Sequence, residues 1–457
     1  METNLLNISV ADGRYSNITK PLKHYFSEYA YFRYRLQVEI FYLVDLIDIL
    51  FCDTETNEEK LEKYSNHKTL IKSINLNFSV KDCVYIKEIE KKINHDVKSV
   101  EYYIREQLTK LSLEQYIPYI HFGLTSQDIN NTAIPLMLKG ANNTIYIPML
   151  KKIIKDLKTK YEKWKDIVII SKTHGQSAVP TTFGKELNVF AYRLTKQLDK
   201  LKEVTYYGKF GGAVGNFNAH VCSYPDIKWN EFADKLLQKL GLEREQCTTQ
   251  ICNYDNIAEI LNILSRIDTI LIDMCVDIWL YISNNFLKLS INKEEVGSST
   301  MPQKVNPINF ENAEGNLNMA NALLDKMSGK LPISRLQRDL TDSTITRNFG
   351  ICYAFIIIAM DNITKGLLKI DVNLEKIQEN KIRCITVLME SIQTILRKHG
   401  YKDAYEICKT FSRNSNRDNY NILDIECFIT ELEVNEIIKK ELLDNINIDK
   451  YIGYASL

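Results

Sequence analysis

The sequence predicts an all-α protein with a central bundle of long helices, and three observations support this fold class. Glycine and proline are scarce, with 17 glycines and 9 prolines among 457 residues, about half their usual share. Apolar residues recur at three- and four-residue spacing over long stretches, which is typical of helices that bury one face. Patterns that alternate between apolar and polar residues, as strands do, are few.

Three consecutive regions differ in composition and in their helical patterns, and we expect each to be a helical domain. Residues 1–113 mix short helical patterns with a polar stretch, and we expect them to hold part of the active site. Residues 114–366 contain the longest helical patterns and should form the central bundle. Residues 367–457 are rich in Asn, Lys and Glu and include amphipathic segments such as 385–399.

The clearest predicted helix covers residues 256–289, where apolar residues follow the i, i+3, i+4, i+7 pattern. At 1.5 Å per residue it would be ~50 Å long, which is too long for one small globular core. Such a helix suits a bundle shared between subunits. Residues 151–164 and 184–201 show similar periodicity.

The composition excludes several classes of protein. Lys and Arg total 58 and Asp and Glu total 58, so the chain lacks the basic excess of a nucleic-acid-binding protein. The ten cysteines are scattered, without a CxxC pair or a Cys/His cluster at zinc spacing, so we expect reduced thiols and no metal site. No signal-peptide pattern starts the chain, and every long apolar stretch carries charges. We therefore expect a cytoplasmic protein without a membrane partner.

One segment, GSSTMPQKVNP at residues 297–307, combines loop-forming residues with reactive groups. It lies between the long predicted helix and another helical pattern that starts near Asn309. Its hydroxyls, ammonium and amide could hold a carboxylate. Considered alone, the segment is more simply explained as a linker between two helices.

This segment resembles the mobile signature loop of the fumarase/aspartase/argininosuccinate lyase superfamily, and a match of this length is highly specific. The segments TSQD at 125–128 and THGQ at 173–176 resemble other blocks of the superfamily, in the expected order. Ser177 and Val179 depart from a stretch that usually contains Pro or Ala, but neither is a residue to which we assign chemistry.

Further segments resemble the bacterial-type adenylosuccinate lyase branch of this superfamily: DGRY at 12–15, NHDVK at 94–98, KFGGAVGNFNAH at 209–220, and QRD through STITR at 337–347. The resemblance covers roughly residues 10–370. It implies β-elimination of fumarate from adenylosuccinate to give AMP, a step of purine nucleotide biosynthesis, without a metal or cofactor. The sequence leaves open whether the related imidazole-carboxamide ribonucleotide (SAICAR, giving AICAR) is also cleaved.

Such a reaction needs an acid, a base, donors at the carboxylate that gains charge, and a phosphate clamp. The resemblance identifies His174 as the general acid, against the alternative of a buried structural histidine. It identifies Ser298 as the general base, with Ser299 as the rival one residue away. A serine alkoxide needs an electropositive, donor-rich pocket, which loop amides and Lys304 could supply.

Four residues are expected to bind the two carboxylates of the substrate. Lys304 and Asn306 should hold the carboxylate that accumulates charge, although lysines are most often simply exposed. Thr125 and Ser126 should bind the other carboxylate. The alternative for this pair is a helix N-cap, and both roles are compatible because a helix N-terminus is itself an anion site.

The remaining candidates surround the nucleotide. Arginines suit bidentate phosphate binding, although each one alone is more often a surface ion-pair partner. The predicted phosphate clamp is Arg14, Tyr15, Arg338, Ser343 and Arg347. His95 should aid orientation or protonation, Asn94 and Asp96 should line the site, and Gln250 should contact the substrate.

These residues span more than 330 positions of the chain, and the resemblance implies a homotetramer in which each site is built from three chains. Two rival hypotheses remain open at this point. One is another lyase of the superfamily, namely argininosuccinate lyase, aspartase or fumarase, which has no need of a phosphate clamp. The other is a catalytically silent helical scaffold, because a fold alone does not imply activity.

Overall fold

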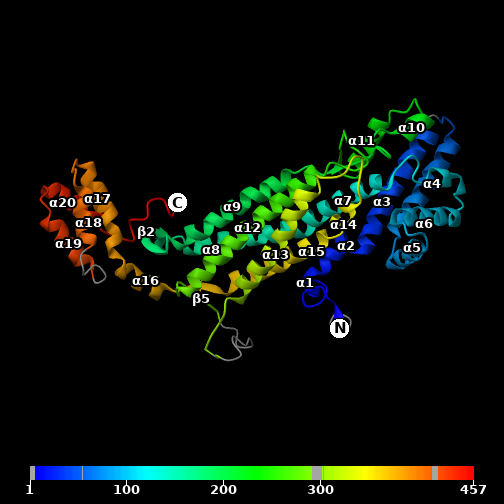
Figure 1. Cartoon of the computed structure of the whole chain (residues 1–457). Coiled ribbons are helices and arrows are strands. Elements are labelled where there is room, and N and C mark those ends of the chain that lie inside the picture. The colour runs from blue at the N-terminus through cyan, green and yellow to red at the C-terminus, as the bar shows by residue number, and fades with distance from the viewer. Residues whose placement is uncertain (1–5, 54, 291–300, 302, 414–419, 457) are drawn as a thin grey trace. The chain divides into compact units, whose positions relative to one another are not determined.

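The computed structural model describes residues 6–53, 55–290, 301, 303–413 and 420–456. Most of these residues are helical, and the strands among them form three two-stranded sheets. The predicted all-α class is therefore confirmed (Figure 1).

The chain divides into two compact units, each assembled from three separate stretches. Unit 1 comprises Met1–Met149, Gln197–Thr269 and Asn316–Ala359, and unit 2 comprises Leu150–Lys196, Ile270–Gly315 and Met360–Leu457. The boundaries between them fall within or beside long helices. The three consecutive regions expected from sequence texture stay a prediction.

Five long helices contribute residues to both units: α8 (Ile147–Trp164), α9 (Phe183–Glu203), α12 (Asp255–Ser283), α13 (Ile308–Lys330) and α15 (Phe349–Lys369). The helical patterns at 151–164 and 184–201 are confirmed within α8 and α9, and the pattern near Asn309 is confirmed in α13. The stripe predicted for α12 is buried, since residues such as Leu261, Leu264 and Leu271 are 0% exposed.

The predicted end of the α12 helix at residue 289 is wrong, because the helix stops at Ser283. Asn285 has a φ of 60°, a left-handed conformation that Asn tolerates and that ends a helix. The chain then enters strand β5 (Leu287–Leu289), which pairs antiparallel with β6 (Ile370–Val372). The apolar residues of β5 extended the apparent helical stripe, although they belong to a strand. The helix is therefore ~43 Å long rather than ~50 Å.

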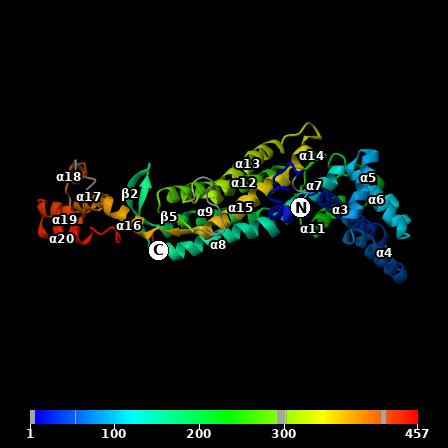
Figure 2. The same cartoon turned by 90° about the horizontal axis from the view of Figure 1, so that it is seen from below.

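The helical layer at the start of unit 1 has its own apolar core. The elements of this layer are α1 (Ser16–Thr19), η2 (Lys20–Leu22), α2 (Lys23–Phe26), α3 (Glu28–Ile47), η3 (Asp48–Cys52), α4 (Glu58–Leu76), α5 (Val80–Ile93), α6 (Asp96–Lys110) and η4 (Glu114–Tyr119). Buried residues of α3, including Leu36 and Ile40, pack with α4, α5 and α6. Figure 2 shows α3 to α6 gathered together, in blue to cyan.

The rest of unit 1 supplies the loops of the candidate site. Its elements are α7 (Ser126–Ala141), η5 (Asn142–Tyr146), β3 (Tyr207–Gly208), α10 (Asn218–Ser223), α11 (Trp229–Lys239), β4 (Glu243–Arg244) and α14 (Thr341–Thr346). Strands β3 and β4 pair in parallel. Helix α7 packs against both α3 and β3.

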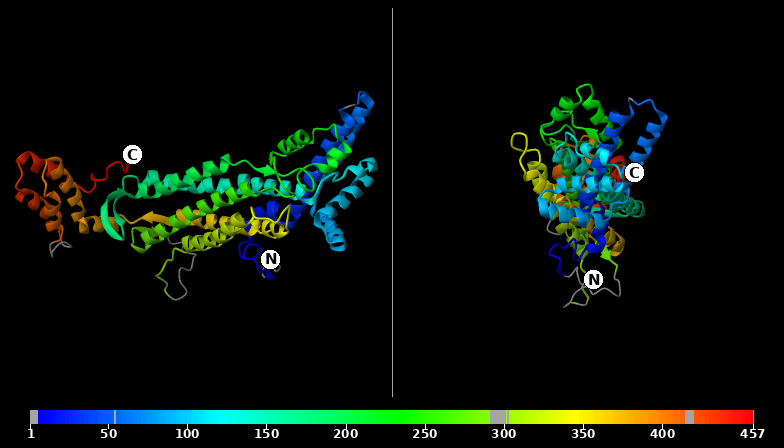
Figure 3. Two further views of the ribbon diagram at one scale, coloured as in Figure 1. Left: turned by 45° about the horizontal axis from the view of Figure 1, so that its top comes forward. Right: turned by 90° about the vertical axis from the view of Figure 1, so that its right-hand side faces the viewer.

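Unit 2 contains a β-hairpin and a small C-terminal helical bundle. Strands β1 (Val168–Thr173) and β2 (Gln176–Thr182) are antiparallel, and apolar residues of β1 share a core with the C-terminal helices. These helices are α16 (Leu374–Arg383), η6 (Ile385–Leu388), α17 (Met389–Lys398), α18 (Ala404–Ser412), α19 (Ile422–Glu431) and α20 (Glu436–Asp444). They are drawn orange to red in Figure 3. The amphipathic segment at 385–399 is confirmed as η6 and α17.

One stretch, Thr341–Lys369, contains a helix that is long and apolar enough to cross a membrane by length and composition. However, 61% of its most apolar window is buried inside the protein, as in the core helix of a soluble protein. Most of this window therefore packs against other parts of the protein.

Candidate active site

Most of the predicted nucleotide-binding residues of unit 1 line one pocket of about 590 Å³. The pocket lies where α5 ends, where α6 and α7 begin, and beside α14. The predicted residues that line it are Asn94, His95, Asp96, Ser126, Arg338, Ser343 and Arg347.

The turn between α5 and α6 fixes two of these residues. Asn94 ends α5 in the left-handed conformation, with a φ of 51°. His95 caps α6, because its Nδ1 accepts a hydrogen bond from the backbone N–H of Lys98 at 3.0 Å. This bond requires a lone pair on Nδ1, so the neutral ring carries its proton on Nε2. The arrangement suits the orienting or protonating role expected of His95.

The start of α7 forms a capping box. The Thr125 side chain accepts from the third helical N–H, and the Thr125 N–H donates to Asp128 Oδ2 at 2.8 Å. The alternative of a helix N-cap is therefore what the structure shows for Thr125. Ser126, the first residue of the helix, lines the pocket, so the positive end of the helix dipole is available to an anion there.

Asp96 lies between two guanidinium groups. Its Oδ2 is 2.8 Å from Arg35 Nη2 and 2.9 Å from Arg347 Nη2. Burial raises the pKa of the Asp96 carboxyl, but Arg35 and Arg347 lower it further, and the net pKa is below its usual value. Asp96 is thus an anion that holds Arg347 at the pocket.

Arg338 is held loosely at the other side of the pocket. Its Nη1 donates to Gln250 Oε1 and its Nη2 to Ser343 Oγ, both at 3.4 Å. Its Nε is buried and has no hydrogen-bond partner within the described residues. These long bonds and the spare donor leave Arg338 able to bind an anion. Gln250 does not line the pocket but contacts it through Arg338.

Arg14 and Tyr15 are not among the residues that line this pocket. The Arg14 side chain is exposed and lies 5.8 Å from the centre of the Tyr15 ring. Neighbouring N-terminal residues, including Asp12, line a second pocket of about 430 Å³. Arg347 lines both pockets, so it connects the N-terminal segment with the candidate site.

The residues assigned to proton transfer belong to unit 2. His174 and Gly175 form the tip of the β1–β2 hairpin, with φ values of 52° and 74°, as in a type I′ turn. His174 is exposed in this chain, so it is not a structural histidine buried in the core of its own subunit. Lys304 is exposed and Asn306 is half-buried, whereas Ser298 and Ser299 lie outside the described residues. The candidate residues therefore occur in both units.

Two ion pairs made by residues of α3 were missed by sequence reasoning. Arg35 of α3 donates from Nε to Asn130 Oδ1 at 2.8 Å, in addition to its pairing with Asp96. His121 Nδ1 is 2.6 Å from Glu39 Oε1. Burial lowers the pKa of His121, but Glu39 and Glu101 raise it more, to about 9. The available signal was two charged residues, Arg35 and Glu39, four positions apart on α3 and flanked by apolar residues.

Asp128 was also missed, and it organises the glycine-rich loop after β3. Its Oδ1 accepts from Lys209 Nζ at 2.8 Å and from the N–H groups of Gly211 and Gly212 at 2.8 and 3.1 Å. Both Asp128 and Lys209 are 0% exposed, and burial lowers the pKa of Lys209 despite the nearby carboxylate. The FGGAVGNFNAH segment therefore serves the site by positioning rather than by lining the pocket.

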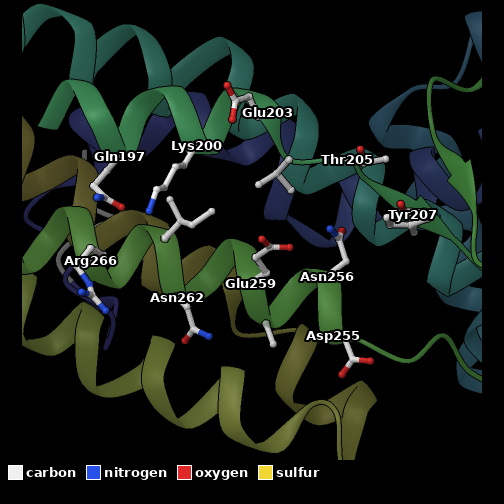
Figure 4. A pocket seen from close by; sticks show the side chains of 13 residues that line it. Gln197, Lys200, Glu203, Thr205, Tyr207, Asp255, Asn256, Glu259, Asn262 and Arg266 are labelled. Atoms are coloured by element: carbon white, nitrogen blue, oxygen red, sulfur yellow. The ribbon is translucent and has the colours of Figure 1, made fainter.

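A larger pocket of about 860 Å³ lies between α9 and α12 in unit 1 (Figure 4). Its charged residues are of both signs, with Lys200 and Arg266 among the bases and Glu203 and Glu259 among the acids. It contains none of the predicted site residues. A phosphate clamp needs clustered cations, so the 590 Å³ pocket with Arg338 and Arg347 is the better candidate.

The chain is similar to known enzymes over nearly its whole length. Residues 13–321 match the family model described as lyase, and residues 334–452 match that described as adenylosuccinate lyase C-terminal. Adenylosuccinate lyase of Dictyostelium discoideum is 47% identical, with 96% of this chain and 95% of the relative covered. Adenylosuccinate lyase of Escherichia coli is 40% identical, with 99% and 98% covered.

Solved structures support the fold. A fumarate lyase from Mesorhizobium has a TM-score of 0.75 at 16% identity, with 96% of both chains covered. A 3-carboxy-cis,cis-muconate lactonizing enzyme from Pseudomonas putida has a TM-score of 0.72 at 16% identity, with 96% of this chain and 94% of that chain covered. At this identity the likeness concerns the fold alone.

Proposed function

The chain belongs to the adenylosuccinate lyase family and is a carbon–nitrogen lyase, and from this premise we propose how its residues carry out the reaction. The reaction is the β-elimination of fumarate from adenylosuccinate to give AMP, in purine nucleotide biosynthesis. The rival lyases of the superfamily are not favoured by these relatives.

The observation that carries the proposal is the pocket with Arg338 and Arg347 beside the N-terminus of α7. Arg338, Ser343 and Arg347 bind the nucleotide phosphate through charge-assisted hydrogen bonds. Ser126 and Thr125 bind one carboxylate of the succinyl group at the positive helix end. Fumarate, malate and aspartate carry no phosphate, so this pair of anion sites fits a nucleotide better than the substrates of the rival enzymes.

The chemistry itself is assigned to residues of unit 2. Ser298, as an alkoxide, takes the proton from the carbon beside a carboxylate, and that carboxylate gains negative charge. Lys304 and Asn306 stabilise this charge. The electron pair then forms the double bond of fumarate as the C–N bond breaks, and His174 donates a proton to the departing purine nitrogen. An exposed histidine at a hairpin tip is accessible for such a transfer.

We further propose a cytoplasmic homotetramer in which each site is built from three chains. Exposed apolar residues occupy one face of α12, where Val276, Trp279 and Leu280 are 39%, 40% and 47% exposed. Their spacing of three and four residues places them on the same side of the helix. An exposed apolar face of this kind supports a subunit contact. Light scattering and enzyme activity should be measured on the same dilution series. Activity should fall as the tetramer dissociates, and active monomers would contradict the proposal.

An absorbance assay tests the reaction. The purified protein should convert adenylosuccinate to AMP and fumarate, with a change in purine absorbance. Argininosuccinate, aspartate and malate serve as the comparison substrates. Turnover of one of these without conversion of adenylosuccinate would contradict the proposal.

A further inference from the structure

A buried amide in α7 holds the 252–254 segment, from which two routes lead to Arg338. Asn131 is 1% exposed, and both ends of its side chain are used. Its Nδ2 donates to the hydroxyl of Tyr254 at 2.7 Å, and its Oδ1 accepts from the backbone N–H of Cys252 at 2.9 Å.

The first branch leads through Tyr254 to the residues beside Arg338. The Tyr254 hydroxyl donates to Asp342 Oδ2 at 2.8 Å, and Asp342 Oδ1 accepts from the N–H of Ser343 at 2.7 Å. Tyr254 and Asp342 are 3% and 6% exposed. Burial raises the pKa of Tyr254 well above its usual value, so the hydroxyl keeps the proton that it donates. Ser343 Oγ in turn accepts from Arg338 Nη2.

The second branch leads through the backbone of Cys252. Gln250 lies two residues before Cys252, and its Oε1 accepts from Arg338 Nη1. Its Nε2 donates to the carbonyl of Ala213 at 3.0 Å, which fixes the orientation of the amide. Both contacts of the Arg338 guanidinium therefore lead back to the side chain of Asn131.

We propose that Asn131, Tyr254 and Asp342 form a positioning unit that sets the Arg338 guanidinium for the substrate phosphate. The inference rests on the proposed function, in which Arg338 binds that phosphate. Helix α7 also presents Ser126 at its first turn, so the same rigid element fixes the spacing between the phosphate and carboxylate sites. The positioning unit thus determines how strongly the enzyme prefers a phosphorylated substrate over its nucleoside.

The test is the Tyr254→Phe variant, which keeps the ring and removes the hydroxyl that links Asn131 to Asp342. Steady-state kinetics are measured with adenylosuccinate and with the same molecule lacking the phosphate. We expect KM for the nucleotide to rise about tenfold, the cost of one misaligned charge-assisted contact, while kcat changes less than about threefold. The kcat/KM for the nucleoside should stay near the wild-type value, so the preference for phosphate falls about tenfold.

A matched control comes from another buried tyrosine of unit 1. The Tyr206 hydroxyl accepts from Asn142 Nδ2 at 2.8 Å, and Tyr206 is 7% exposed. This pair repeats the amide–phenol chemistry without a hydrogen-bonded route to Arg338 in the described residues. Tyr206→Phe should destabilise the fold to a similar extent and leave the preference for phosphate unchanged.

The outcomes separate the two proposals. Equal losses for nucleotide and nucleoside in Tyr254→Phe, or the same shift in Tyr206→Phe, would overturn the positioning role. A wild-type enzyme that does not distinguish nucleotide from nucleoside would instead overturn the phosphate clamp. In an Arg338→Met background, Tyr254→Phe should cause no further loss of preference. If Tyr254→Phe does not fold, Asp342→Asn weakens the same branch while conserving its shape, and the same comparison applies.

Discussion

The two units hold their candidate residues in contrasting ways. In unit 1, Thr125, Asp96 and Arg338 are held by part-buried hydrogen bonds and ion pairs, those of Arg338 being the longest. In unit 2, His174 stands exposed at a two-residue turn, without a hydrogen-bond partner for its ring among the described residues, and Lys304 is also exposed. The candidate pocket of unit 1 is therefore preorganised, whereas His174, the proposed acid, is presented on an exposed turn.

This contrast separates binding from chemistry. Changes in unit 1 should act mainly on KM and stability, because they disturb a built pocket. Changes in the hairpin and the 297–307 loop should act mainly on kcat, because those groups are needed chiefly in the transition state.

The largest effect is expected from Ser298→Ala. Removing the proposed base should lower kcat by about 10³-fold or more while KM changes little, since proton abstraction is lost but the pocket of unit 1 is intact. Stopped-flow absorbance with adenylosuccinate and equilibrium binding of AMP measure the two quantities. Ser299→Ala is the matched control and should retain most of the activity. A near-normal kcat in Ser298→Ala together with a large loss of kcat in Ser299→Ala would identify Ser299 as the base instead.

The next effect concerns stability and pH in unit 1. The folded pKa of His121 is about 9 and the ordinary value is 6.5, so its protonated form stabilises the folded state. This stabilisation, at most about 3 kcal/mol, is fully present below pH 6.5 and is lost as the pH rises through 9. Urea unfolding between pH 6 and 10 should show that loss in the wild type. His121→Asn, which tolerates the left-handed backbone, should show a flatter curve.

A second histidine provides an internal contrast for this measurement. Burial lowers the pKa of His220 to about 4, so the folded state holds it neutral. Its effect has the opposite sign, because stability is lost as the pH falls from 6.5 towards 4. If the free energy of unfolding of His121→Asn still falls between pH 6.5 and 9 as in the wild type, the pair of His121 with Glu39 does not control stability in this pH range.

Arg338→Met should raise KM for adenylosuccinate by about 10–100-fold, which corresponds to the loss of about 1.5–3 kcal/mol from charge-assisted hydrogen bonds. We expect kcat to change by less than threefold. Arg335→Met is the control, because Arg335 is exposed and pairs with Asp339 outside the pocket. A fall in kcat with an unchanged KM would break the proposed separation of binding from chemistry.

The smallest effect is expected at the hairpin tip. Gly175 has a φ of 74°, so an alanine there would cost about 1–2 kcal/mol and should displace His174 from its turn. Gly175→Ala should therefore lower kcat more than it raises KM. Gly175→Asn should be milder, since Asn tolerates this conformation. Steady-state kinetics and thermal unfolding of both variants measure the difference, and equal kcat values would argue against a need for precise placement.

The fold class could be predicted because local patterns carry it. The candidate site residues came instead from the family resemblance, and the structure brings seven of them to one pocket: Asn94, His95, Asp96, Ser126, Arg338, Ser343 and Arg347. The stripe of α12 follows from helical periodicity, and TSQD reads as a helix start because Thr and Asp fit a capping box. The end of α12 was placed too late because Leu287 and Leu289 are apolar whether they lie in a helix or a strand. Periodicity does not distinguish the two over so short a run.

The buried contacts of the site could not be predicted in the same way. Arg35 pairs with Asp96, and Asn131 bonds to Tyr254, across more than 60 and 120 residues of chain respectively. Such pairs depend on how distant elements pack, and a single sequence contains no local signal for them. The placement of Arg14 outside the pocket lining is of the same kind, since it depends on where the N-terminal segment packs.

The partners of Asp128 have a consequence for how the protein is made. The carboxylate leaves the ribosome more than 80 residues before Lys209, Gly211 and Gly212, which are 81, 83 and 84 positions further along the chain. At about 5–20 residues per second, that interval is about 4–16 s of translation. An unpaired charge is costly to bury, so Asp128 stays hydrated during this delay and becomes buried only after the glycine loop has been synthesised.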